Sequence, residues 1–131
     1  MTPDNLLYAE THEWVKLETE AGQRVATIGI SAFAVEQLTD LVFMQLKPVG
    51  SELKAGQEFG EVESVKAVSP LYMPVSGKII AVNDHLAQQL ETLGSDPFGQ
   101  GWMIKVVVSD ESELKKLLDP NTYQAQCESN G

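Results

Sequence analysis

EFGEVESVKAVSPLYMPVSGKIIAV, residues 58–82, is the stretch of sequence that decides the fold. Strand-like runs at 58–65 and 71–82 lie on either side of a tight connection around Lys66. The residues VSG at 75–77 indicate a second tight turn. Together these patterns predict a β-hairpin that holds Lys66 at its tip.

Two alternating runs earlier in the chain predict another hairpin. In residues 12–18, Val15 and Leu17 alternate with polar neighbours. Residues 24–30 alternate in the same way after a turn signalled by Ala21 and Gly22. The two runs are expected to pair as antiparallel strands.

Short helices and a further strand are predicted between these hairpins and after them. Ser31 is a typical N-cap for a helix over 32–38, because its hydroxyl accepts from free amides of the first turn. LVFMQL at 41–46 is typical of a buried strand. DHLAQQLETLG at 84–94 contains enough helix formers for one short helix.

The C-terminal part predicts one more strand and then helices. Apolar residues recur with period two over 102–108, as expected for a final core strand. Asp110 is a candidate N-cap, with Glu113 completing a capping-box pattern. Pro120 suits the first turn of another helix, where its missing N–H costs nothing.

The sum of these elements is six to eight short strands with a short internal helix and one or two C-terminal helices. That pattern predicts a mainly β fold, a sandwich or barrel of antiparallel strands with a helical extension from about residue 110. A chain of 131 residues is long enough for one continuous core, so residues 1–131 are interpreted as a single domain.

Charge excludes some classes of partner. Nine Lys and Arg residues against nineteen Asp and Glu residues give a net charge of −10, which disfavours nucleic acid and anionic membranes. No stretch is apolar for long enough to span a bilayer, and MTPDNLLYAE at 1–10 has no targeting pattern. The single cysteine, Cys127, lies in a polar tail and suits a reducing compartment. A cytoplasmic protein with basic protein partners is expected.

Motifs of conventional catalysis are missing from the sequence. There is no P-loop, and His12 and His85 belong to no cluster with metal-ligand spacing. Cys127 has no histidine near it in sequence, and His12 beside Glu13 is interpreted as a surface or partly buried polar pair. No catalytic or metal-binding residue is predicted. Lys66, taken alone, is a solvated turn lysine.

Around ESVKA at 63–67, the sequence resembles the H proteins of the glycine cleavage system. The resemblance extends over nearly the whole chain and depends most on ESVKA at 63–67. Other matching segments, in the family's order and spacing, are THEWV at 11–15, TIGI at 27–30, LTDLVFMQLKPVG at 38–50, PVSGKIIAVND at 74–84, DPFGQGWMIKV at 96–106 and SELKKLLDPNTY at 112–123.

The resemblance implies a covalent cofactor. Lys66 corresponds to the lysine that carries lipoate in an amide bond, and its neighbours Glu63, Ser64, Val65 and Ala67 form the recognition context. Biotin-carrying domains also present a hairpin lysine, but usually between methionines, so lipoate is favoured. The implied fold is a barrel-sandwich hybrid of the lipoyl and biotinyl type.

The resemblance also implies a carrier role rather than an enzymatic one. In the family, the lipoyl arm takes an aminomethyl group from a pyridoxal-phosphate glycine decarboxylase. The arm then delivers it to a tetrahydrofolate-dependent aminomethyltransferase and is reoxidised by dihydrolipoamide dehydrogenase. A lipoate ligase or a lipoyl/octanoyl transferase attaches the cofactor. Thr11 and Glu13 align with polar residues of the cleft that shelters the loaded arm.

Two departures from the family pattern keep alternatives open. Pro70 stands four positions after the lysine, where the family usually has an acidic residue, and Lys78 replaces a common glutamate. The Pro70 departure favours one alternative, an H-like carrier for lipoate relay or sulfur metabolism. Two alternatives from other classes are an unmodified interaction module of the same fold and an enzyme that uses His12 and Glu13 directly.

Overall fold

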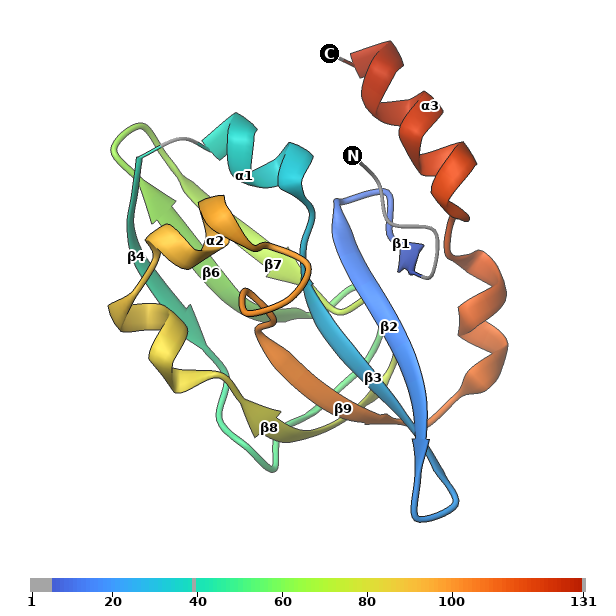
Figure 1. The fold of residues 1–131 in the computed structure, drawn as a ribbon. Coiled ribbons are helices and arrows are strands. Elements are labelled where there is room, and N and C mark those ends of the chain that lie inside the picture. The colour runs from blue at the N-terminus through green and yellow to red at the C-terminus, as the bar shows by residue number, and fades with distance from the viewer. Residues whose placement is uncertain (1–5, 39, 131) are drawn as a thin grey trace.

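Two antiparallel sheets form the centre of the fold (Figure 1). The computed structural model describes residues 6–38 and 40–130. The larger sheet has the strand order β1-β2-β3-β9-β8-β5 and the smaller sheet β4-β6-β7. The strands are β1 (Leu7–Tyr8), β2 (Glu13–Glu20), β3 (Gln23–Ile30), β4 (Leu41–Leu46), β5 (Glu52–Leu53), β6 (Glu58–Ser64), β7 (Val68–Tyr72), β8 (Gly77–Val82) and β9 (Ile104–Val108).

Five short helices complete the described residues. They are α1 (Ala32–Leu38), the 3₁₀ helix η1 (Asp84–Gln88), α2 (Glu91–Ser95), the 3₁₀ helix η2 (Glu111–Lys116) and α3 (Pro120–Asn130). The predicted mainly β fold is therefore confirmed. The interpretation of residues 1–131 as one domain, and of 1–10 as free of a targeting pattern, extends to residues outside the described ones and stays a prediction.

The main core lies between the two sheets. Ile28 and Val106 from the larger sheet and Phe59 and Val62 from the smaller one are fully buried in one cluster. Each fully buried side chain of this size contributes about 2 kcal/mol to folding. Packing between the sheets therefore supplies much of the driving force for the fold.

A second cluster covers the outer side of the β1–β2–β3 region. It consists of Leu6, Tyr8, Trp14, Tyr123 and Cys127, and α3 lies alongside β1 to complete it (Figure 1). Cys127 is therefore buried, and its assignment to a polar tail is wrong because one side of α3 packs against aromatic rings. All residues of β3 from Val25 to Ile30 are buried.

The strand at 41–46 is present as β4, but the prediction that it is buried is wrong. Only Met44 is buried, whereas Val42 and Phe43 are 55% and 46% exposed. A register irregularity between Leu41 and Phe43 interrupts the pairing of β4 with β6. The smaller sheet has only one face in the core, so its other face leaves apolar side chains open to solvent.

The strand predicted over 71–82 is two strands in different sheets. The return strand of the hairpin, β7, starts at Val68 and belongs to the smaller sheet. The turn at 75–77 then leads into β8 of the larger sheet. The turn between β7 and β8 therefore carries the chain from one sheet to the other. Alternation in the sequence does not reveal this change of sheet.

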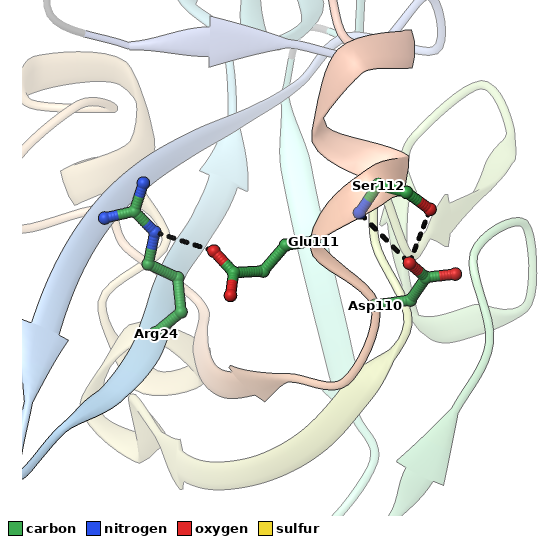
Figure 2. A network of polar contacts seen from close by, with 4 residues as sticks. All are labelled: Arg24, Asp110, Glu111 and Ser112. Atoms are coloured by element: carbon green, nitrogen blue, oxygen red, sulfur yellow. Dashed lines mark hydrogen bonds and ion pairs between the residues drawn. The ribbon is translucent and has the colours of Figure 1, made fainter.

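The predicted helix starts agree only in part with the structure. The Ser31 cap is confirmed, because its Oγ accepts from the Ala34 amide at 3.2 Å. The single helix predicted over 84–94 is split into η1 and α2. Asp110 caps η2 by accepting from the Ser112 amide at 3.0 Å and hydroxyl at 2.5 Å (Figure 2).

The capping box proposed for Glu113 is wrong. Its carboxylate instead accepts from the amide and hydroxyl of Ser76, at 2.7 and 2.9 Å. Arg24 of β3 points toward Glu111 of η2 (Figure 2), and the Arg24 Nε lies 3.5 Å from the Glu111 Oε1. The two contacts attach η2 to β3 and to the turn before β8, although an exposed ion pair of this kind contributes at most about 1 kcal/mol.

The chain after η2 continues into α3. Pro120 is the first residue of this helix, as predicted, and Asp119 accepts from the Thr122 amide at 2.7 Å. Among the described helices, none combines the length and apolar character needed to cross a bilayer.

Candidate functional site: the hairpin lysine and its adjoining cleft

Lys66 lies in a three-residue connection between β6 and β7, and its side chain is exposed. The buried Ser64 organises this tip. Its backbone amide donates to the Ala67 carbonyl at 2.8 Å. Its hydroxyl lies 3.3 Å from the Lys66 amide and 3.2 Å from the Ala67 amide. The lysine therefore projects from a tightly bonded turn rather than from a loose loop.

The connection between α1 and β4 supports the hairpin from the side. The Val65 amide donates to the Asp40 carbonyl at 3.2 Å. Asp40 has a positive φ of 34°, which turns its carbonyl toward the hairpin. In Figure 1 the β6–β7 tip lies close to α1 at one end of the molecule.

Around Lys66 the surface is apolar and acidic. Val65 and Val68 are 66% and 53% exposed, and Ala67 is exposed as well. Glu63 lies between Phe43 and Val68 in the strand register. This mixture of apolar and carboxylate groups suits a partner with an apolar contact surface flanked by basic residues.

A cleft of about 560 Å³ borders the return strand of the hairpin. One side is formed by β7, a second by α1, and a third by the turn that leads into β2. The cleft begins where the hairpin tip ends, so a group attached to Lys66 has an adjoining cavity. Its lining residues are Glu10, Thr11, His12, Glu13, Ile30, Phe33, Ala34, Gln37, Leu38, Ser69, Pro70, Leu71 and Tyr72.

Glu13 is the ionisable group of most interest in this cleft. Its side chain is 1% exposed. It accepts a hydrogen bond from the Thr11 hydroxyl and another from the Tyr72 amide at 3.1 Å. Burial raises the pKa of this carboxyl to about 7, although both hydrogen bonds act in the opposite direction. At neutral pH it can therefore hold a proton or release one to pair with a cation.

His12 does not form the polar pair with Glu13 that the sequence suggests. Its φ of 81° is a left-handed backbone conformation, and the two side chains bond to different partners. The His12 Nδ1 lies 2.7 Å from the Tyr123 hydroxyl, and burial lowers the pKa of the imidazole. Glu13 instead turns to Thr11 and Tyr72.

The two departures from the family pattern lie in different places. Pro70 lines the cleft on β7, an edge strand where a residue without an N–H is tolerated. Lys78 lies in β8 opposite Glu52 and lines a separate hollow of about 1120 Å³. Only the Pro70 departure bears on the cleft.

Sequence reasoning missed Ser31 and Tyr123 as members of this region. Their hydroxyl oxygens are 2.5 Å apart, although 92 positions separate them in the chain. No local sequence pattern can indicate a contact between residues so far apart in the chain. Within the described residues, no group of three His, Cys, Asp or Glu side chains is placed to hold a metal ion.

Two facing antiparallel sheets with few short helices define the class of the fold, a lipoyl-type barrel-sandwich. A crystal structure of a glycine cleavage system H protein from Mycobacterium marinum superimposes with a TM-score of 0.81 at 38% identity. The match covers 95% of this chain and 97% of that one.

The sequence comparisons identify the family. Residues 6–130 match the family described as Glycine cleavage H-protein, and the chain belongs to this family. The glycine cleavage system H protein of Rhodopirellula baltica is 55% identical, with 98% of this chain and 97% of that protein covered. The probable glycine cleavage system H protein of Haloarcula marismortui is 51% identical, with 96% of each covered.

Proposed function

We propose that Lys66 carries lipoate in an amide bond, and that the protein shuttles the aminomethyl intermediate of glycine on this arm. The observation that supports the proposal is the exposed Lys66 side chain on a tightly bonded turn beside a cleft that contains Glu13. The chain belongs to a family of lipoyl-bearing carriers of the glycine cleavage system.

The residues around Lys66 suit attachment of the cofactor. Neutral Val65 and Ala67 leave the Nζ accessible, and Ser64 holds the turn in shape from below the surface. Glu63, Val65 and Ala67 together with exposed Phe43 offer a lipoate ligase or a lipoyl/octanoyl transferase a surface to recognise. An enzyme that acylates the Nζ of Lys66 has to contact these neighbouring residues, because the lysine side chain enters the active site of that enzyme.

The cleft is proposed to shelter the loaded arm. The bound lipoyl group supplies the sulfur that carries the one-carbon unit, and that chemistry belongs to the cofactor and the partner enzymes. Glu13, assisted by Thr11, pairs with the cationic amine of the load. Because the carboxyl group is buried and only partly ionised near neutral pH, a cation beside it favours loss of its proton.

The protein itself is proposed to turn over no substrate. Its partners are a glycine decarboxylase, an aminomethyltransferase and dihydrolipoamide dehydrogenase, each of which acts on the arm. The net charge of −10 favours partners with basic docking surfaces.

Intact mass spectrometry tests the attachment. The protein is co-expressed with a lipoate ligase, together with the variants Lys66→Arg and, as a matched control, Lys78→Arg. One lipoyl group is expected on the natural protein and on Lys78→Arg, and none on Lys66→Arg. A lipoyl group that persists in Lys66→Arg contradicts the proposal, and no added mass on the natural protein favours an unmodified interaction module.

Exchange of labelled bicarbonate into glycine tests the pathway. Lipoylated protein with a competent glycine decarboxylase is expected to support exchange, whereas the unlipoylated protein is not. Lipoylated protein that supports no exchange points instead to a lipoate relay or a sulfur-metabolising complex. Turnover of glycine by the unlipoylated protein alone would indicate an enzyme that uses His12 and Glu13.

A further inference from the structure

We propose that Tyr123 of α3 is a positioning residue of the arm cleft, because its hydroxyl joins two of the walls of that cleft. This inference depends on the proposed function, since it assumes that the cleft holds the loaded arm. Tyr123 does not line the cleft itself. It acts through His12 and Ser31, which come from the turn before β2 and from the residue before α1.

The hydroxyl lies between two side chains that are far apart in the sequence. The Tyr123 Oη is 2.5 Å from the Ser31 Oγ and 2.7 Å from the His12 Nδ1. Ser31 in turn accepts from the Ala34 amide, so it is bonded to the first turn of α1. The Ser31 amide donates to the His12 carbonyl at 2.9 Å, which closes the network.

The turn that carries His12 needs such support. A φ of 81° is a left-handed conformation that costs a non-glycine residue about 1–2 kcal/mol. Backbone bonds hold the turn from one side, because the Ala9 amide donates to the Glu13 carbonyl at 2.8 Å and the His12 amide donates to the Ala9 carbonyl at 3.0 Å. Tyr123 holds it from the other side, one residue from the Glu13 carboxyl group.

Tyr123 is itself rigidly placed. Its side chain is 1% exposed, and its ring stacks on Tyr8 with centroids 4.4 Å apart. Burial raises the pKa of its hydroxyl, which therefore stays protonated at physiological pH. A protonated hydroxyl can donate to one neighbour and accept from the other, so both bonds are satisfied together.

Replacement of Tyr123 by Phe separates this role from simple packing. The variant keeps the ring and its stacking on Tyr8, but leaves the His12 imidazole and the Ser31 hydroxyl without their shared partner. We expect a looser turn at His12 and a less fixed Glu13, while the two sheets stay intact.

Amide hydrogen exchange on the unlipoylated protein is the first test. Tyr123→Phe is expected to raise the exchange rates of the His12 and Ser31 amides about tenfold, a loss of roughly 1.4 kcal/mol of local stability, with little change in β9. The matched control Leu6→Ala removes apolar contact from the same cluster and is expected to lack this local increase. Unchanged exchange at His12 and Ser31 in Tyr123→Phe would overturn the proposal.

A second variant guards against a folding defect in the first. Ser31→Ala removes the other end of the 2.5 Å contact. The double variant carries both Tyr123→Phe and Ser31→Ala. If the two hydroxyls act together, its fold-increase in the His12 amide exchange rate is smaller than the product of the fold-increases in the two single variants. Independent, multiplicative effects would contradict the network.

The loaded protein gives the second readout. The aminomethyl group is expected to be lost from lipoylated Tyr123→Phe several times faster than from lipoylated Leu6→Ala. A looser turn with an unchanged rate of loss would overturn the positioning role. If no lipoate attaches to Lys66, the proposed function fails, but the exchange experiment still decides whether Tyr123 holds the turn.

Discussion

At the scale of single residues, Glu13 has the most unusual environment in the cleft. The fold buries its carboxyl group almost completely, and its two hydrogen-bond donors offset only part of the cost of removing a charge from water. The result is a pKa of about 7 against an ordinary value of 4.5. Such a group binds a cation strongly only after it releases its proton.

This pKa predicts a pH-dependent stability. Because the folded state holds the proton more tightly than the unfolded state, the stabilisation is complete below about pH 4.5 and is lost as the pH rises through about 7. A shift of this size corresponds to a loss on the order of 3 kcal/mol. Urea unfolding at several pH values is expected to show a smaller decline for Glu13→Gln, which keeps an acceptor for the Tyr72 amide but cannot titrate.

Comparison of the two proteins removes the contribution of the other carboxyl groups, which both share. Equal declines in the natural protein and Glu13→Gln across this pH range would show that the fold does not raise the pKa of Glu13.

At the scale of elements, β6 supports the lysine through its close pairing with β4. Gly60 permits this approach, since a Cβ built there would lie 2.3 Å from the Gln45 carbonyl oxygen and 2.9 Å from a Leu46 methyl carbon. The sequence marks Gly60 only as a glycine within a strand. The need for it arises from the neighbouring strand.

Gly60→Ala is therefore expected to destabilise the protein by about 1–3 kcal/mol, because the backbone of β4 has to move. Gly94→Ala in α2 is the control, since a Cβ there meets nothing within 4 Å. That variant is expected to be neutral or up to about 1 kcal/mol more stable, as is usual for alanine in a helix. Thermal unfolding of the three proteins measures both effects, and equal melting temperatures for the two variants would refute the close contact at Gly60.

At the scale of the whole molecule, negative charge dominates the surface. The net charge is −10, and the two ion pairs found among the described residues are both exposed. Carboxylates such as Glu61 and Glu63 lie on one strand without a basic residue opposite them in the register. Self-repulsion of this kind destabilises the compact state and is screened by salt.

Added salt is thus expected to raise the free energy of unfolding, by about 1 kcal/mol between low ionic strength and roughly 0.5 M sodium chloride. Urea unfolding at the two salt concentrations measures the effect. Glu20→Lys, at an exposed position beside the β2–β3 turn, is expected to reduce this increase in the free energy of unfolding with salt. A fall in stability with salt would mean that favourable ion pairs outweigh the repulsion.

Most of the strands, the hairpin tip and the Ser31 cap were predictable from the sequence, because alternation, turn residues and caps depend on neighbours within a few positions. The two-residue strand β1 was not predicted. Lys66 was singled out by the ESVKA context; it is exposed on the hairpin, and its lipoylation stays a prediction. Only the tertiary structure decided the partners of Glu113, Cys127 and Tyr123, and the splitting of 71–82 between two sheets. These depend on contacts tens of residues apart, which the packing of the sheets and α3 creates and which no local pattern encodes.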